Sequence, residues 1–134
     1  MRAKIMLIAF IIIMPFVSLA DDEIAAAQGI IRSQMEALVR NDGATAYTFA
    51  SPALQQIFQQ PDVFMAMVEK NYAPIHRHKR LAFAESQLSA GQVAQKVQII
   101  DAEGDPWTAL YTVERQPDGT LKITGCTLVK ETGA

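Results

Sequence analysis

The stretch WTALYTVERQPDGTLKITGCTL, Trp107–Leu128, decides the fold because its residues follow the pattern of two strands joined by a tight turn. Apolar and polar residues alternate along its first part, where one face is formed by Trp107, Ala109, Tyr111 and Val113. This period of two is typical of a half-buried antiparallel hairpin, and Pro117–Gly119 has the composition of its turn. We therefore expect an antiparallel sheet whose apolar face is covered by the upstream part of the chain.

Two more strands are predicted before this hairpin, at Arg80–Gln87 and Gln92–Asp101. The second of them alternates well between apolar and polar residues. Each connecting turn contains the glycine that a short hairpin loop needs. The sequence therefore predicts a four-stranded antiparallel meander, in which Pro106 marks an edge or bulge position.

The residues before the strands predict helices. The first is expected at Asp22–Arg40, capped by Asp21 or Asp22. Asn41–Gly43 ends it, and Gly43 is able to take a left-handed conformation. Its apolar stripe recurs at three- and four-residue spacing through Ile24, Ala27, Ile31, Met35 and Leu38. Shorter helices are predicted at Ala44–Ala50, from Ser51-Pro52 to Phe58, and from Pro61 to Lys70, followed by a loop at Asn71–Lys79. Helices followed by a meander of strands indicate an α+β fold.

The first twenty residues have the organisation of a secretory signal peptide. Two basic residues precede the uncharged apolar run Ile5–Val17, and the small residues Ser18 and Ala20 precede the expected cleavage point. An uncleaved membrane anchor is the alternative, but the run is shorter than the ~20 residues that a spanning helix needs. We expect cleavage after Ala20, a periplasmic or secreted location, and a single α+β domain over residues 21–134. Membrane contact is expected only through the signal segment before cleavage.

Charge and cysteine content narrow the classes of function. The first twenty residues carry two of the 12 Lys and Arg residues, so the remainder has 10 basic against 14 acidic residues, a net charge of −4. A mildly acidic small domain lacks the basic surface of a nucleic-acid-binding protein. Cys126 is the only cysteine, so the chain has no internal disulfide. We interpret it as a packed strand residue, with an intermolecular disulfide or a reactive thiol as the alternative.

Several groups of residues together resemble one bacterial family of exported domains of unknown function. They are Arg40–Asp42, Ala46–Pro52, Phe64–Val68, Tyr72–Pro74, Asp101, Gly104, Trp107–Ala109, Tyr111, Glu114–Gly119, Ile123 and Gly125–Cys126. The resemblance covers nearly the whole mature chain. It implies a nuclear-transport-factor-2-like cone, also called cystatin-like, in which a curved sheet wraps around a long helix, and it implies no catalytic residues. The segment Ile75–Arg80 is richer in histidine and basic residues than the family pattern.

Five aromatic residues are candidates for a binding site, namely Tyr47, Phe64, Tyr72, Trp107 and Tyr111. In a cone fold of this type, the open end between the helices and the sheet can hold a small apolar ligand between aromatic walls. The alternative is that these side chains fill the core of a small domain, with the tyrosine hydroxyls at its rim.

Clusters of charged residues are weaker candidates. On an extended backbone His76 and His78 share a face, but local spacing supplies no further metal ligand and the neighbouring basic residues oppose a cation. An anion-binding patch or a solvated loop is the alternative. Asp101, Glu103 and Asp105 crowd one turn, where carboxylates are ordinary solvated residues or, less commonly, ligands of calcium or acid–base groups.

The sequence contains no catalytic motif or cofactor-binding fingerprint. We therefore expect no catalytic residue, no metal and no cofactor. We favour a non-catalytic binding or interaction module that dimerises through the outer face of the sheet. That face is predicted to carry Thr108, Leu110, Thr112, Lys122, Thr124, Cys126 and Leu128. The alternative is a small-molecule-binding or isomerase-like enzyme that uses an aromatic-lined cone cavity, with Glu85 or Asp101 as its carboxylate.

Overall fold

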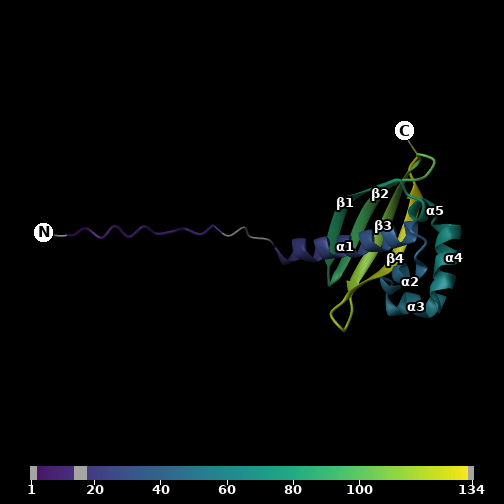
Figure 1. Ribbon diagram of the computed structural model, residues 1–134, viewed down its shortest axis with the longest axis horizontal. Helices are drawn as coiled ribbons and strands as arrows, with labels where there is room; N and C mark the ends of the chain where they lie inside the picture. Colours follow the sequence, from purple (N-terminus) through teal and green to yellow (C-terminus); the bar gives the residue numbers. More distant parts are fainter. Residues whose placement is uncertain (1–2, 14–17, 133–134) are drawn as a thin grey trace.

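The computed structural model describes residues 3–13 and 18–132 and has all of its helices before its strands (Figure 1). The helices are α1 (Leu19–Val39), α2 (Gly43–Thr48), α3 (Pro52–Phe58), α4 (Pro61–Asn71) and α5 (Ala73–His76). The strands are β1 (Arg80–Ser89), β2 (Gln92–Ile100), β3 (Pro106–Arg115) and β4 (Leu121–Lys130). This order confirms the α+β class.

The four strands form one antiparallel sheet in the order β1-β2-β3-β4, as predicted. Consecutive strands are joined by short turns, in which Gly91, Gly104 and Gly119 have positive φ angles of 78°, 86° and 87°. Residues with a side chain rarely adopt this conformation, so the three glycines allow the chain to reverse tightly. The meander follows from strand-by-strand alternation and from these turns.

Helix α1 lies across one face of the sheet, and the shorter helices lie to one side of it, towards β4 (Figure 1). The stripe predicted for α1 is the one that is buried: Ala27, Ile31, Met35 and Leu38 have 0–1% of their surface exposed. Their partners on the sheet are the inward residues Val93, Val97, Ile99, Ala109, Tyr111, Val113 and Ile123. Burial of these apolar side chains supplies the main driving force for folding. The chain has no disulfide that would add to this stability.

Three local predictions for the helical half were wrong. Helix α1 begins at Leu19, earlier than predicted, because the Ser18 hydroxyl accepts a hydrogen bond from the backbone N–H of Asp21 and caps the helix. After its end, Asn41 takes the left-handed conformation (φ 58°), whereas Gly43 begins α2. The predicted loop Asn71–Lys79 contains the short helix α5, whose first turn accommodates Pro74.

A β-bulge in β4 corrects the predicted outer face of the sheet. The pairing runs Thr112 with Gly125 and then Val113 with Ile123, so Thr124 is an extra residue. The bulge reverses the alternation, and Cys126 and Leu128 therefore pack against the core, although the sequence pattern placed them outside. Leu110, on β3, does face outward and is exposed.

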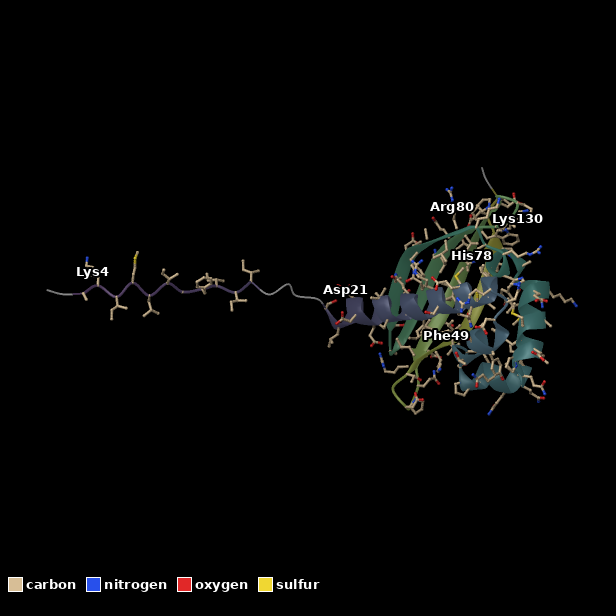
Figure 2. The ribbon with its side chains drawn as sticks, viewed as in Figure 1. Lys4, Asp21, Phe49, His78, Arg80 and Lys130 are labelled. Carbon is tan, nitrogen blue, oxygen red and sulfur yellow. The ribbon has the colours of Figure 1, made fainter. Side chains whose placement is uncertain are left out.

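The link between α2 and α3 is fastened to β4. The backbone N–H of Ser51 donates to the Ile123 carbonyl at 2.8 Å, and the Ile123 N–H donates to the Phe49 carbonyl at 2.8 Å. Figure 2 labels Phe49 at this junction. Because these bonds hold the short helices beside β4, a space bounded by helices and sheet remains between α1, α3, α4 and β4.

Residues 3–13 extend away from the domain as a tail without secondary structure (Figure 1). Their large apolar side chains from Ile5 to Ile13 are at least 75% exposed. Residues 14–17 of the predicted signal peptide lie outside the described residues. Within the described residues, no helix combines the length and the apolar character that crossing a bilayer requires.

Candidate functional site

A cavity of about 240 Å³ lies between the helices and the last two strands. Its walls come from α1, α3, α4, α5, β3 and β4, and are mostly apolar. The lining residues are Gln34, Leu38, Leu54, Phe58, Phe64, Met67, Val68, Tyr72, Ile75, Tyr111, Ile123, Gly125 and Cys126. This is the position at which a cone fold was expected to hold a ligand.

Four of the five predicted aromatic residues belong to this region. Phe64, Tyr72 and Tyr111 line the cavity directly. Tyr47 packs against Phe64 with ring centroids 5.8 Å apart, and its hydroxyl donates to the Gln55 carbonyl at 2.9 Å. Tyr47 therefore supports the wall from behind and does not line the cavity.

Trp107 lies apart from the other four predicted aromatic residues. It is at the start of β3, four residues before Tyr111, and its indole N–H donates to the Asp101 carboxylate at 2.8 Å. Asp101 also accepts hydrogen bonds from the backbone N–H groups of Glu103 and Asp105. Burial raises the pKa of Asp101, but these hydrogen bonds and the positive charge of Lys130 outweigh it, so the pKa is lowered. Asp101 and Trp107 thus organise the turn before β3, and neither lines the cavity.

Three polar side chains on the cavity wall are interconnected around Cys126. The hydroxyl of Tyr72 donates to the Cys126 carbonyl at 3.0 Å, which ties the end of α4 to β4. Burial raises the pKa of the Cys126 thiol to about 12, an effect that hydrogen bonding with Tyr111 offsets only in part. The pKa values of Tyr72 and Tyr111 are also raised, first by burial and then by the proximity of Cys126. All three groups are therefore uncharged at neutral pH.

Gln34 and Cys126 are cavity residues that sequence reasoning missed. Gln34 lies three residues after Ile31 and four before Leu38, so it belongs to the buried side of α1, and it is 5% exposed. A glutamine on an otherwise apolar helical stripe was a signal available in the sequence. Cys126 had no such signal, because its inward orientation depends on the bulge at Thr124.

The charged candidates from the sequence lie away from the cavity. His76 hydrogen-bonds to the Asn41 side chain at 2.7 Å, and the Nδ1 atom of His78 lies 2.8 Å from the Ile75 carbonyl oxygen. Figure 2 shows His78, Arg80 and Lys130 towards the same end of the molecule. Across residues 3–13 and 18–132, no three His, Cys, Asp or Glu side chains come together as a metal site would require.

Glu85, one of the two carboxylates considered for an isomerase-like site, is also outside the cavity. It is on β1 and forms a surface ion pair with Lys96 at 3.7 Å, in which both side chains are more than half exposed. Asp101 is engaged by Trp107 and its own turn. Among the described residues, the lining of the cavity contains no carboxylate, histidine, lysine or arginine.

The structure, with a helical layer on one face of a four-stranded antiparallel meander, has a nuclear-transport-factor-2-like α+β fold, as its match to a solved structure shows. A crystal structure of an NTF-2-like protein of unknown function from Silicibacter pomeroyi matches with a TM-score of 0.56 and 19% sequence identity. The match covers 85% of this chain and 100% of that chain. A de novo designed β-sheet protein with a cystatin fold matches 61% of this chain and 99% of its own, at 13% identity and a TM-score of 0.36.

Residues 20–134 match the family described as "Domain of unknown function (DUF4864)", and the chain belongs to this family. No curated protein matches the chain. The comparisons therefore confirm the fold and the family that the sequence indicated, and they assign no activity.

Proposed function

We propose that this protein is a non-catalytic binding module for a small, uncharged and largely apolar molecule, held in the cavity between the helices and β3–β4. The observation that carries the proposal is the cavity itself, which is lined by leucine, isoleucine, valine, methionine and aromatic side chains. Apolar cavities of this kind, with few polar groups, are the usual form of small-molecule sites.

The chemistry of the lining favours binding over catalysis. A catalytic thiol needs a lowered pKa, because the thiolate is the nucleophile, but the pKa of Cys126 is raised to about 12. A general acid or base needs a titratable group within reach of the substrate. The carboxylates considered for an isomerase, Glu85 and Asp101, are placed elsewhere. An enzyme in this cavity would therefore lack a group of suitable reactivity among the described lining residues.

The expected place of action is the periplasm or the exterior, after cleavage near Ala20. The basic start and the apolar run Ile5–Val17 support this proposal, as does the start of the family match at residue 20. N-terminal sequencing of the protein recovered from its own cells tests it. Asp21 as the first residue is expected, and Met1 on the native protein would contradict it.

Methionine methyl groups provide a test of the cavity. Met67 lines the cavity, whereas Met65, on the same helix α4, lies outside the lining and beside Gly43, so the two report on specific and non-specific contact in one molecule. We expect toluene, added to the mature protein that begins at Asp21 and carries ¹³C-methyl methionine, to shift the Met67 signal much more than the Met65 signal. Toluene is also expected to raise the melting temperature, because it binds only the folded state.

A cavity-filling variant supplies the control. Cys126→Leu adds side-chain volume to the cavity, whereas Cys126→Ser keeps the size of the original side chain. We expect Cys126→Leu to abolish the toluene-induced shift of Met67 and Cys126→Ser to retain it. Equal shifts of Met67 and Met65, or no shift at millimolar toluene, would contradict the proposed function.

A further inference from the structure

Gln34 is a buried amide whose carbonyl oxygen has no partner within the described part of the protein. The residue is only 5% exposed, and its Nε2 atom donates to the Ala46 carbonyl at 3.2 Å. That bond fixes the orientation of the amide, because only the nitrogen can donate to a carbonyl. The Oε1 atom then accepts no hydrogen bond from any described residue.

This oxygen is reached from the cavity. Every side-chain nitrogen or oxygen that is completely buried among the described residues has a hydrogen-bond partner. An unpartnered Gln34 Oε1 is therefore accessible, and Gln34 lines the cavity. A bound molecule displaces water from this oxygen, so a donor on that molecule would keep the acceptor paired, whereas a molecule without a donor would leave it buried and unpaired.

The Tyr72 hydroxyl, another polar group of the wall, does not compete for this role. The hydroxyl of Tyr72 donates to the Cys126 carbonyl and is thus directed at the protein itself. The hydroxyl of Tyr111 lies near the Cys126 thiol. The cavity consequently presents an acceptor, the Gln34 oxygen, to a molecule inside it.

Size and charge restrict the molecule further. A cavity of about 150 Å³ holds a benzene ring, and drug-sized sites start near 300 Å³, so about 240 Å³ corresponds to one ring with a few substituents. An ion would lose its hydration in this lining without gaining an opposite charge, which disfavours carboxylates and amines.

We propose that Gln34 is a specificity-determining residue, whose Oε1 accepts a hydrogen bond from the hydroxyl group of an uncharged, single-ring alcohol or phenol bound in the cavity. This inference rests on the proposed function, because it specifies the ligand class of the same cavity.

The test compares p-cresol with toluene, which differ by one hydroxyl group, in the mature protein that begins at Asp21. The variant is Gln34→Met, which keeps the length of the side chain and removes its oxygen. We expect Gln34→Met to weaken p-cresol binding about 2- to 12-fold, the range for one net hydrogen bond, and to change toluene binding less than twofold. The matched control is Gln98→Met on the exposed part of β2, which is expected to change neither affinity.

Gln34→Met also removes the hydrogen bond to Ala46, so a second measurement is made on the wild-type protein. We expect p-cresol, and not its methyl ether 4-methylanisole, to shift the Gln34 side-chain carbonyl carbon in NMR spectra, because only p-cresol has a donor. Equal loss of p-cresol and toluene affinity in the variant, or equal carbonyl shifts with p-cresol and 4-methylanisole, would overturn the role of Gln34. The proposed function would still be supported in that case if the ligands shift the Met67 signal. If none of the three probes shifts Met67, both proposals fail.

Discussion

At the scale of single residues, Gln95 shows how one buried amide repairs an irregular strand. It is on β2, is 0% exposed, and faces the bulge of β1 between Phe83 and Ser86. Its Nε2 atom donates to the carbonyls of Ala84 and Lys96 at 3.1 and 2.8 Å. Its Oε1 atom accepts from the side chains of Ser86 and Gln28 at 2.6 and 3.0 Å. The amide therefore satisfies groups that a regular ladder would have paired.

We expect Gln95→Leu to lower the free energy of unfolding by about 1–3 kcal/mol, because it leaves buried carbonyl groups without a donor. The control is Gln98→Leu, an exposed position on the same strand, for which a change within about 0.5 kcal/mol is expected. Urea denaturation followed by circular dichroism measures both values. Similar losses for the two variants would mean that the Gln95 network does not stabilise the sheet.

Asp101 is predicted to make the protein sensitive to acid. Its pKa in the folded protein is lowered, since hydrogen bonds from Trp107 and two backbone amides, with the charge of Lys130, outweigh the opposing effect of burial. A carboxylate with a lowered pKa contributes stability that is complete above its unfolded pKa of about 3.9. That contribution is lost as the pH falls through the folded-state value.

Denaturation midpoints of the wild type and Asp101→Asn between pH 7 and pH 2 test this prediction. We expect the variant to be less stable at pH 7 and the difference to shrink as the pH falls below about 4. Glu103→Gln serves as the control, because it removes a charge from the same turn and leaves the Trp107 bond intact. A difference that stays constant down to pH 2 would show that Asp101 acts through shape and not through its charge.

At the scale of elements, the bulge in β4 decides which residues face the cavity. Without the extra residue Thr124, the simple alternation of the strand would direct Cys126 outward. The bulge instead places Cys126 on the inner face, where burial raises its pKa to about 12, while Thr127 on the outer face is exposed.

We therefore expect Cys126 to react with iodoacetamide at pH 8 at least about 30-fold more slowly in the folded protein than in urea, because little thiolate is present. In a Cys126→Ala background, Thr127→Cys is expected to react at a rate close to that of an unfolded thiol. Mass spectrometry of the alkylated protein gives both rates. Rates within about threefold of each other would place Cys126 on the accessible face.

At the scale of the whole molecule, the described helices cover one face of the sheet and leave the other without a covering layer (Figure 1). The outer face contains threonines and two exposed apolar side chains, Leu110 and Val129, which are 39% and 57% exposed. The homodimer through this face stays a prediction. Cys126 and Leu128 no longer belong to the predicted surface, because both pack against the core.

Light scattering over a range of concentrations tests the dimer. We expect the wild type to have the mass of a dimer and Leu110→Lys to have the mass of a monomer, because a buried lysine at the interface would lose its hydration. Ile57→Lys is the matched control, since Ile57 is 69% exposed but is on α3. A wild-type monomer at all concentrations would contradict the prediction.

Periodicity and turn chemistry by themselves determined the α+β class, the four-stranded meander and the buried stripe of α1, because these depend on the spacing of neighbouring residues. The resemblance to the family, read from residues spread over the chain, indicated the cone. The structure brings Phe64, Tyr72 and Tyr111, three of the five predicted binding residues, to the lining of one cavity.

Only the tertiary structure decided which side chains form the cavity. Trp107 and Tyr111 share a strand face, yet about 13 Å of strand separates them. Tyr111 therefore lines the cavity, whereas Trp107 contacts the turn before β3. Cys126 faces inward because one extra residue, Thr124, reverses the alternation of β4, and a sequence pattern does not show where such a bulge falls. The orientation of the Gln34 amide depends on Ala46, whose carbonyl accepts a hydrogen bond from Nε2 and so leaves Oε1 for the cavity. These features depend on contacts between distant segments, which local spacing does not specify.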